Sequence, residues 1–299
     1  MVLVSDLDRD RARGVVDSLG EDRAAVANDA ADVDVALLAA PGATHADLAR
    51  RYVTDHIPVV SVADELDDVR ALLELDEVAR DNGVAVVVGA GFSPGLTCVL
   101  AAHAAASLDQ VDEVHVAKVG TGGPSCAQAH HRALAGAALD WRDGGWVTRR
   151  GGSGRELCWF PDPIGGEDCY RAALADALLL APAFPGVERI TARIGANRRD
   201  RITAKLPMLR PPHPEGGPGA ARVEVRGRRG SARVVQVLGA MDRPAVAAGA
   251  VAALAAVAAG GRQLRRDGSA GLAELVDPLW FLSLLAQRGV KAAVFEGKS

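Results

Sequence analysis

The first eight residues, Met1-Val2-Leu3-Val4-Ser5-Asp6-Leu7-Asp8, decide how the fold is interpreted. Residues 1–5 are typical of a buried strand, and a charged helical stretch begins directly after the acid at position 6. In a dinucleotide-binding fold this is the pattern of the second strand, whose terminal carboxylate binds the ribose hydroxyls. The first strand and its glycine-rich loop belong about 20 residues earlier, so we expect a sheet that is truncated at its N-terminus.

Further strands alternate with helices up to residue 95. The strands are short, rich in valine and almost continuously apolar, as in a parallel sheet that is buried on both faces. They are predicted at residues 33–38, 57–62 and 84–88, with a weaker one at 24–27. Thr44 and Asp47 resemble a capping box at a helix start, and Asn82-Gly83 supplies a helix stop. The fold class is therefore α/β, with a Rossmann-like parallel sheet in residues 1–95.

Ligands of open parallel sheets bind at the carboxyl ends of the strands. Those ends are residues 6–8, 39–42, 61–63 and 89–92. We expect Asp6 to bind a ribose, which favours NAD over NADP because an acid repels a 2′-phosphate, although Arg9 is nearby. The alternative role of Asp6 is the N-cap of the following helix.

The segment Gly89-Ala90-Gly91-Phe92-Ser93-Pro94-Gly95 could be mistaken for a phosphate-binding loop. Pro94 removes a backbone N–H where phosphate binding needs donors. The next predicted strand, 111–119, ends in Gly120 and has no acid for a ribose. We interpret the segment as the last strand of the sheet turning into a helix that opens a second domain.

The second part of the chain, residues 96–242, is predicted to be an α+β domain with a mixed or antiparallel sheet, serving the substrate and dimerisation. Asp143-Gly144-Gly145 predicts one hairpin turn and residues 226–230 another, while residues 211–219 form a loop. Helices are predicted at 245–259 and 272–287, followed by a strand at 290–295. Residues 243–299 are thus a third part, of helices and a strand.

Charge and composition support this division and exclude several classes. Residues 1–95 carry 19 acids and 8 arginines (−11), and the remaining residues carry 26 bases and 19 acids (+7), which together give the net charge of −4. An acidic first part argues against nucleic acid as its ligand. The run 245–259 is too short to span a membrane, and no signal peptide is evident. The four cysteines show no metal-ligand spacing, so we expect free thiols, no metal site and a cytoplasmic location.

With these pieces placed, the chain resembles the saccharopine-dehydrogenase-like family of NAD(P)-dependent oxidoreductases. Four motifs carry the resemblance: residues 2–8, residues 33–41 followed by His45, residues 79–84 leading into 89–96, and the tail at 288–290 and 295–297. Taken in this order and spacing, the four motifs extend over almost the whole chain.

The resemblance implies a Rossmann domain, a substrate domain with a mixed sheet, and a final helix and strand that pack back on the first domain. It implies NAD or NADP as cofactor, an amino-acid-derived substrate with a reacting C–N bond, and a homodimer. The cofactor would lie against Asp6, Leu7, Asp8, Ala39, Ala40, Pro41, His45, Ser61, Val62, Gly91 and Phe92. The loop Thr121-Gly122-Gly123-Pro124 would bind the substrate, or it is an ordinary tight turn.

No catalytic residue is identified from the sequence. Lys118, His130, His131 and Asp140 are candidate proton carriers, and the two histidines point to different faces of a helix predicted at 127–136. Arginines crowd residues 193–210 and 222–233, which we interpret as a solvated surface. The alternative to an oxidoreductase is a non-catalytic Rossmann-type protein that binds a ligand weakly or serves as an oligomeric partner.

Overall fold

Residues 1–34 form a small unit with a two-stranded parallel sheet. The computed structural model describes residues 1–27, 33–40, 44–208, 211–290 and 292–294. In the small unit β1 (Val2–Val4) pairs with β2 (Ala24–Val26), and α1 (Arg9–Leu19) connects them. Val2 is 54% exposed. The predicted burial of this strand is therefore wrong, because within the described residues a single neighbouring strand and one helix do not cover both of its faces.

The larger unit, residues 35–299, contains a parallel sheet with the order β14-β5-β4-β3. β3 (Ala36–Leu38), β4 (Val59–Ser61) and β5 (Ala85–Val88) lie inside the ranges predicted from the sequence, and their pairings are parallel. β14 (Gly268–Gly271) was not predicted, because its sequence Gly-Ser-Ala-Gly has none of the β-branched residues typical of strands.

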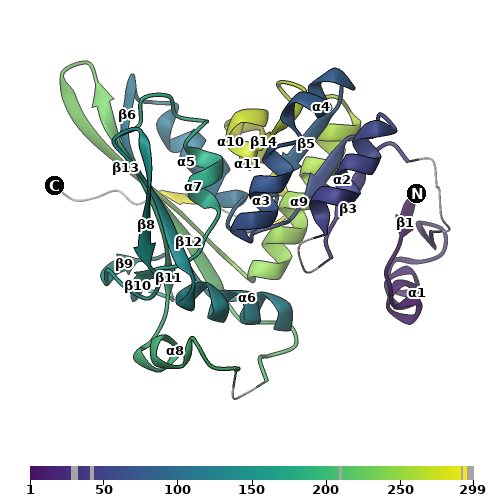
Figure 1. Ribbon diagram of the computed structural model, residues 1–299, viewed down its shortest axis with the longest axis horizontal. Coiled ribbons are helices and arrows are strands. Elements are labelled where there is room, and N and C mark those ends of the chain that lie inside the picture. The colour runs from purple at the N-terminus through teal and green to yellow at the C-terminus, as the bar shows by residue number, and fades with distance from the viewer. Residues whose placement is uncertain (28–32, 41–43, 209–210, 291, 295–299) are drawn as a thin grey trace. The chain divides into compact units, whose positions relative to one another are not determined.

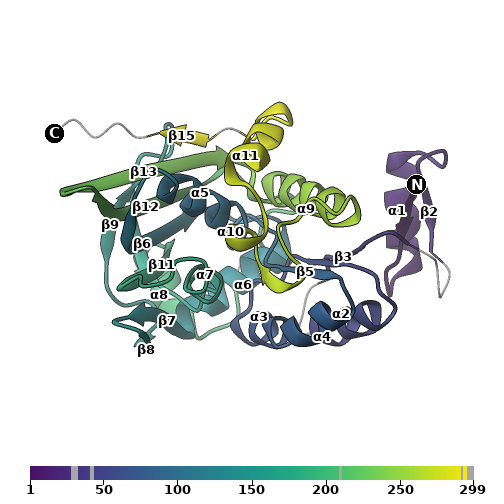
Figure 2. The same ribbon diagram turned by 90° about the horizontal axis from the view of Figure 1, so that it is seen from above.

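Helices cover both faces of this sheet (Figure 2). α2 (His45–Thr54), α3 (Leu66–Leu73) and α4 (Asp76–Asp81) lie on one face, and α9 (Pro244–Gly260) and α11 (Pro278–Gln287) lie on the other. The capping box predicted at Thr44 is wrong, because its side chain makes no capping hydrogen bond. The helix predicted at 272–287 is divided into α10 (Leu272–Leu275) and α11, and the Asp277 side chain caps the second of them.

A mixed sheet forms the other half of this unit (Figure 1). Its main strand order is β15-β13-β12-β6-β11-β10-β9, and β7 pairs with β11 and β8. β6 and β11 are parallel, and the other pairs are antiparallel. The hairpin predicted at Asp143-Gly144-Gly145 is confirmed, and the second hairpin is present, but its turn follows Arg229, since residues 226–229 belong to β12. The strands are β6 (Gln110–Val119), β7 (Ala137–Arg142), β8 (Gly145–Arg150), β9 (Glu156–Trp159), β10 (Gly166–Arg171), β11 (Arg189–Gly195), β12 (Gly219–Arg229), β13 (Ala232–Asp242) and β15 (Ala292–Val294).

Helix α5 (Leu96–Ala105) joins the two sheets through one hydrophobic core. Its residues Leu96, Val99 and Leu100 are buried, and they belong to a cluster that includes Val87 of β5 and Val116 of β6. Each fully buried leucine contributes about 2 kcal/mol. The helices α6 (Pro124–Ala135), α7 (Asp176–Leu180) and α8 (Arg198–Thr203) belong to the same half as the mixed sheet. The predicted mixed α/β fold is confirmed.

The predicted boundaries at residues 95 and 242 remain predictions, since the compact units divide at residues 34 and 35. β15 pairs with β13 of the mixed sheet, so the C-terminal strand does not extend the parallel sheet, whereas α9 packs on β3 and β4. All four cysteines are free thiols.

None of the described helices is long and apolar enough to cross a membrane.

Candidate functional site

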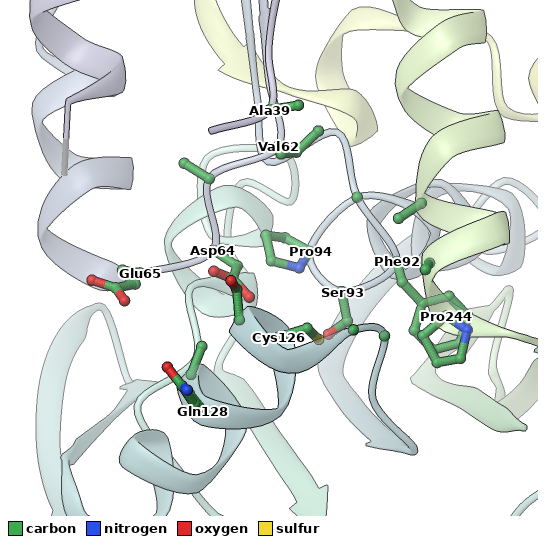
Figure 3. A pocket seen from close by; sticks show the side chains of 18 of the residues that line it. Ala39, Val62, Asp64, Glu65, Phe92, Ser93, Pro94, Cys126, Gln128 and Pro244 are labelled. Carbon is green, nitrogen blue, oxygen red and sulfur yellow. The ribbon is translucent and has the colours of Figure 1, made fainter. Parts of the chain in front are cut away.

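A cavity of about 630 Å³ opens at the carboxyl ends of β3, β4 and β5. Figure 3 shows Ala39 and Val62 on the strand side, Phe92, Ser93 and Pro94 on the loop after β5, and Cys126 on α6. All residues of its lining belong to the larger unit. The cavity therefore lies where ligands of parallel sheets bind, between that sheet and the mixed sheet.

Most residues predicted at the strand ends of this unit line the cavity. The lining includes Ala39, Ala40, His45, Val62, Gly91, Phe92, Gly122 and Gly123. Ser61 is buried behind the surface and contacts His45. Thr121 and Pro124 are in the same loop as the two lining glycines but are not part of the lining. Pro41 lies outside the described residues.

Asp6, Leu7 and Asp8 lie in the small unit, where they form the start of α1. Asp8 Oδ1 accepts hydrogen bonds from the backbone N–H groups of Asp10 (3.0 Å) and Arg11 (3.3 Å), so the helix N-cap is Asp8 rather than Asp6. The Asp6 carboxylate accepts from the backbone N–H of Asp8 at 2.8 Å. Ribose binding by Asp6 stays a prediction.

His45 holds two strand ends together from the start of α2. Its Nε2 lies 2.7 Å from the carbonyl oxygen of Ala40, and its Nδ1 lies 2.8 Å from Ser61 Oγ. A carbonyl oxygen only accepts, so Nε2 carries the proton and Nδ1 accepts from the Ser61 hydroxyl. Ser61 Oγ in turn accepts from the backbone N–H of Ala63 at 3.1 Å. Both ring nitrogens are thus committed to the loops, and His45 shapes the cavity rather than offering a free nitrogen.

The loop after β5 is a tight turn that only glycine allows. Gly95 has φ +123°, and a Cβ there would overlap the carbonyl oxygen of Gly91 and lie 2.7 Å from that of Gly89. The backbone N–H of Gly91 donates to the carbonyl oxygen of Pro94 at 3.1 Å. The expected turn from a strand into a helix is present, since β5 leads through this loop into α5, but β5 is not the last strand of the sheet, because β14 pairs with it on the outer side. The turn directs Ser93 toward the interior.

Lys118 projects from the carboxyl end of β6 into the wall of the cavity. Side chains alternate along a strand, so Lys118 is on the same face as Val114 and Val116, which are buried in the main core. Lys118 is only 8% exposed, and its Nζ donates to the carbonyl oxygen of Ser93 at 3.0 Å. An ammonium has three donors. Among the described residues Ser93 is the hydrogen-bond partner of Nζ, which leaves donors free toward the cavity.

A buried acid, Asp176, lies close enough to Lys118 for the charge of Lys118 to affect its pKa. Asp176 begins α7 and is fully buried; its oxygens accept from Thr97 Oγ1 at 2.6 Å and Ser93 Oγ at 3.0 Å. Burial raises the pKa of Asp176, and the positive charge of Lys118 opposes this rise. Burial, reinforced by Asp176, also raises the pKa of the Cys98 thiol to about 12, so Cys98 is inert.

A second cavity of about 520 Å³ lies on the other side of Lys118. Lys118, Asp64, Cys126 and Arg132 line both cavities. His130 lines only the second one, and its Nε2 donates to the carbonyl oxygen of Gly195 at 3.2 Å. Burial and the neighbouring charge of Lys118 lower the pKa of His130 to about 4, so it is neutral near neutral pH.

The other candidate proton carriers lie away from both cavities. His131 contacts the carbonyl oxygens of Thr203 and Leu206, whereas His130 contacts Gly195, which confirms that the two histidines serve different faces of α6. Asp140 pairs with Arg171 at 3.0 Å. Of the four candidates, Lys118 alone lines the main cavity.

Sequence reasoning missed Asp68, in the first turn of α3. Asp68 is 5% exposed and lines the main cavity, and its Oδ1 accepts no hydrogen bond from the described residues. Burial raises the pKa of Asp68, while His45 and the backbone N–H of Ala46 lower it. Asp68 was not predicted because it belongs to a run of acids with Asp64, Glu65 and Asp67, and such a run is typical of a solvated helix start.

The arginine-rich segments are not simply a solvated surface. Arg193 is 6% exposed, donates to the carbonyl oxygen of Gly154 at 2.9 Å and pairs with Glu156 at 2.8 Å. Arg222 pairs with the buried Glu224 at 2.5 Å. The prediction of solvation is wrong for these arginines, because Glu156 of β9 pairs with Arg193 of β11, and Glu224, two residues after Arg222 on the same face of β12, pairs with Arg222. No group of acids, histidines and cysteines in the described part of the chain could hold a metal ion.

The chain was compared with known proteins. No family model and no curated protein matches its sequence. Among solved structures, it is similar to saccharopine dehydrogenase (L-Glu forming) from Saccharomyces cerevisiae, with a TM-score of 0.64 and 12% identity over 99% of this chain and 93% of that one. An amine dehydrogenase from Mycobacterium smegmatis has a TM-score of 0.45 and 11% identity over 88% and 84% of the two chains. DAP dehydrogenase from C. glutamicum in complex with DAP gives 0.43 and 17% over 86% and 82%.

The resemblance to saccharopine dehydrogenase is thus confirmed at the level of the fold. The match extends over nearly all of both chains, and it does not support the expected loss of a first strand and glycine-rich loop. The chain has a mixed α/β fold similar to that of saccharopine dehydrogenase.

Proposed function

We propose that this protein is an NAD(P)-dependent oxidoreductase that acts on the C–N bond of an amino-acid-derived substrate. One observation carries the proposal. The cavity at the carboxyl ends of β3, β4 and β5 is closed on its far side by the glycine loop before α6 and by the buried ammonium of Lys118. A cofactor on the strand ends and a substrate on the glycine loop would meet beside Lys118.

The cavity fits the nicotinamide end of such a cofactor. Ala39, Ala40, Ala63 and Gly91 carry a methyl group or less, which leaves room for a flat ring against the strand ends. Phe92 adds an apolar surface beside Pro244 at the start of α9 (Figure 3). When bound, the cofactor supplies the hydride chemistry, and the protein provides orientation and a dry surrounding. We propose NAD as the preferred form, on the basis of Asp6.

The opposite wall fits the carboxylate of the substrate. α6 and α9 both begin at the cavity, where Gly123, Ser125 and Ala245 belong to its lining. Neither helix start has a side-chain cap, so backbone N–H groups there have no side-chain acceptor. Helix N-termini and an adjacent ammonium favour an anion. A substrate carboxylate would therefore lie between these helix starts and Lys118.

Lys118 is the residue proposed to move the proton. Oxidation of an amine carbon removes a hydride from carbon and a proton from nitrogen, so the amine becomes an imine and both electrons leave with the hydride. In the reductive direction the Lys118 ammonium would donate a proton toward the nitrogen, and in the oxidative direction Lys118 would have to be neutral so that it accepts the proton released from the amine.

Titration of the full chain with NADH and NADPH, followed by the transfer of tryptophan fluorescence to the bound cofactor, tests the proposal. Saturable binding and amino-acid-dependent reduction of NAD+ or NADP+ are expected. Absence of both would instead favour the non-catalytic ligand-binding alternative. Sedimentation of the same sample measures whether the proposed homodimer forms.

Cofactor preference gives a second test, through Asp6→Arg. We expect the variant to bind NADPH more tightly and NADH more weakly, because an arginine pairs with a 2′-phosphate that an acid repels. Asp10→Arg is the matched control, because Asp10 is also exposed and lies four residues later, in the first turn of α1. Equal binding of both cofactors by wild type and D6R would show that Asp6 does not touch the ribose.

A further inference from the structure

We propose that Asp68 forms a binding subsite for a protonated amino group at the acidic end of the main cavity, and so selects amines over uncharged analogues. This inference rests on the proposed function, since it names the residue that would recognise the amine of the substrate. It depends on the position, burial and unmatched oxygen of one side chain.

Asp68 is a charged group with an unmatched acceptor. It is 95% buried, given its exposure of 5%, it lines the cavity, and its Oδ1 has no hydrogen-bond donor among the described residues. A buried carboxylate oxygen without a donor is costly, and native structures rarely retain one without a purpose. A donor from a ligand in the cavity would satisfy it.

The nearest polar neighbours cannot supply that donor. The Nε2–H of His45 already donates to the carbonyl oxygen of Ala40, and its Nδ1 accepts from the Ser61 hydroxyl. The backbone N–H of Ala46 lowers the pKa of Asp68 but makes no hydrogen bond to Oδ1. If His45 turned to donate a hydrogen bond to Asp68, it would have to give up the contacts with Ala40 and Ser61 that join the ends of β3 and β4.

The surroundings of Asp68 favour a cationic donor over a neutral one. Asp64 lines the same cavity and has no ion-pair partner among the described residues, whereas Glu65 is paired with Arg132 at 3.1 Å. Figure 3 shows Asp64 beside Pro94, on the side of the cavity away from Pro244 at the start of α9. Asp64 and Asp68 thus bring two carboxylates into the lining, and a bound ammonium would neutralise part of their charge.

The subsite is tested by binding of matched ligands to the full chain. The probes are the standard L-amino acids, then, for each one that binds, the 2-hydroxy acid with the same side chain. The hydroxyl keeps the size and a hydrogen-bond donor but removes the positive charge. Calorimetric titration, with and without NAD+ or NADP+, gives the dissociation constants.

Wild type is expected to bind an amino acid about tenfold to a hundredfold more tightly than its 2-hydroxy acid, as for a hydrogen bond between charged groups. In Asp68→Asn this preference should disappear, while binding of the hydroxy acid stays unchanged. Asp67→Asn is the matched control, because Asp67 is one position earlier on α3, is exposed and does not line the main cavity. It should behave as wild type.

Three results would overturn the inference: D68N keeps the preference, wild type shows no preference, or no amino acid binds. If D68N does not fold, Asp68→Ser is measured in its place. If neither variant folds, the inference is judged by whether wild type prefers an amino acid over its 2-hydroxy acid. The proposed function fails separately. If the protein binds cofactor and turns over substrate but its preference for amino acids does not depend on Asp68, only the subsite is refuted. If amino acids bind in an Asp68-dependent way but no cofactor binds, only the oxidoreductase function is refuted.

Discussion

Replacement of Lys118 by methionine tests whether the buried positive charge at the cavity wall stabilises the folded protein. Methionine keeps the length of the side chain and removes the ammonium. Asp176, fully buried, then retains its hydrogen bonds from Ser93 and Thr97 but loses the cation that lowers its pKa. Lys118 acts on the buried carboxylate through space rather than through an ion pair, so we expect K118M to lose about 2–3 kcal/mol of free energy of unfolding, less than the breaking of a buried ion pair costs.

The double variant K118M/D176N separates the pair from the individual side chains. The amide oxygen introduced by D176N can still accept from the hydroxyls, and neither charge of the pair remains. A buried pair replaced by neutral groups is often close to neutral in stability, so about 2 kcal/mol should return. Urea unfolding followed by circular dichroism measures the three free energies. Equal losses in K118M and the double variant would refute the coupling of Lys118 to Asp176.

The same pair predicts a dependence on pH. The pKa of Asp176 is raised in the folded protein because burial disfavours the carboxylate, and K118M raises it further. Between the unfolded pKa of about 3.9 and the raised folded pKa, the folded state holds more protons, so stability falls as pH increases. The deficit of K118M relative to wild type should therefore narrow on acidification toward about pH 4. A deficit that does not change with pH would contradict this account.

Three further substitutions test the frame of the cavity. Gly95→Ala should cost more than about 2 kcal/mol in urea unfolding, because its positive φ and the overlap with Gly91 both exclude a Cβ, and a smaller loss would show that the loop can relax. His45→Phe should lower stability by about 2 kcal/mol, measured by thermal melting, since two buried partners lose their hydrogen bonds; an unchanged melting temperature would argue against the clamp. Phe281→Ala, fully buried in α11, should cost about 3–5 kcal/mol in the same assay, whereas Leu279→Ala, 63% exposed on that helix, should cost little; similar losses would place the core elsewhere.

Local patterns were sufficient for the regular elements of this chain. Valine-rich runs located β3, β4 and β5, because strands buried on both faces need continuous apolar residues. Asp143-Gly144-Gly145 located a hairpin, and the structure shows positive φ at Asp143 and Gly144, the conformation that such turns require. β14 escaped because its Gly-Ser-Ala-Gly sequence has no strand signal, and only its pairing with β5 makes it a strand.

The sequence by itself determined the α/β class, the strand ends where a ligand can bind, and the small residues that line them. Only the tertiary structure decided which polar side chains reach that place. Lys118, Asp176 and Asp68 are far apart in the sequence, and each looks like an ordinary charged residue of a strand or helix. Their burial arises from packing of β6, α7 and α3 around one core, and a linear pattern cannot report the loss of solvent that makes a charge chemically distinctive.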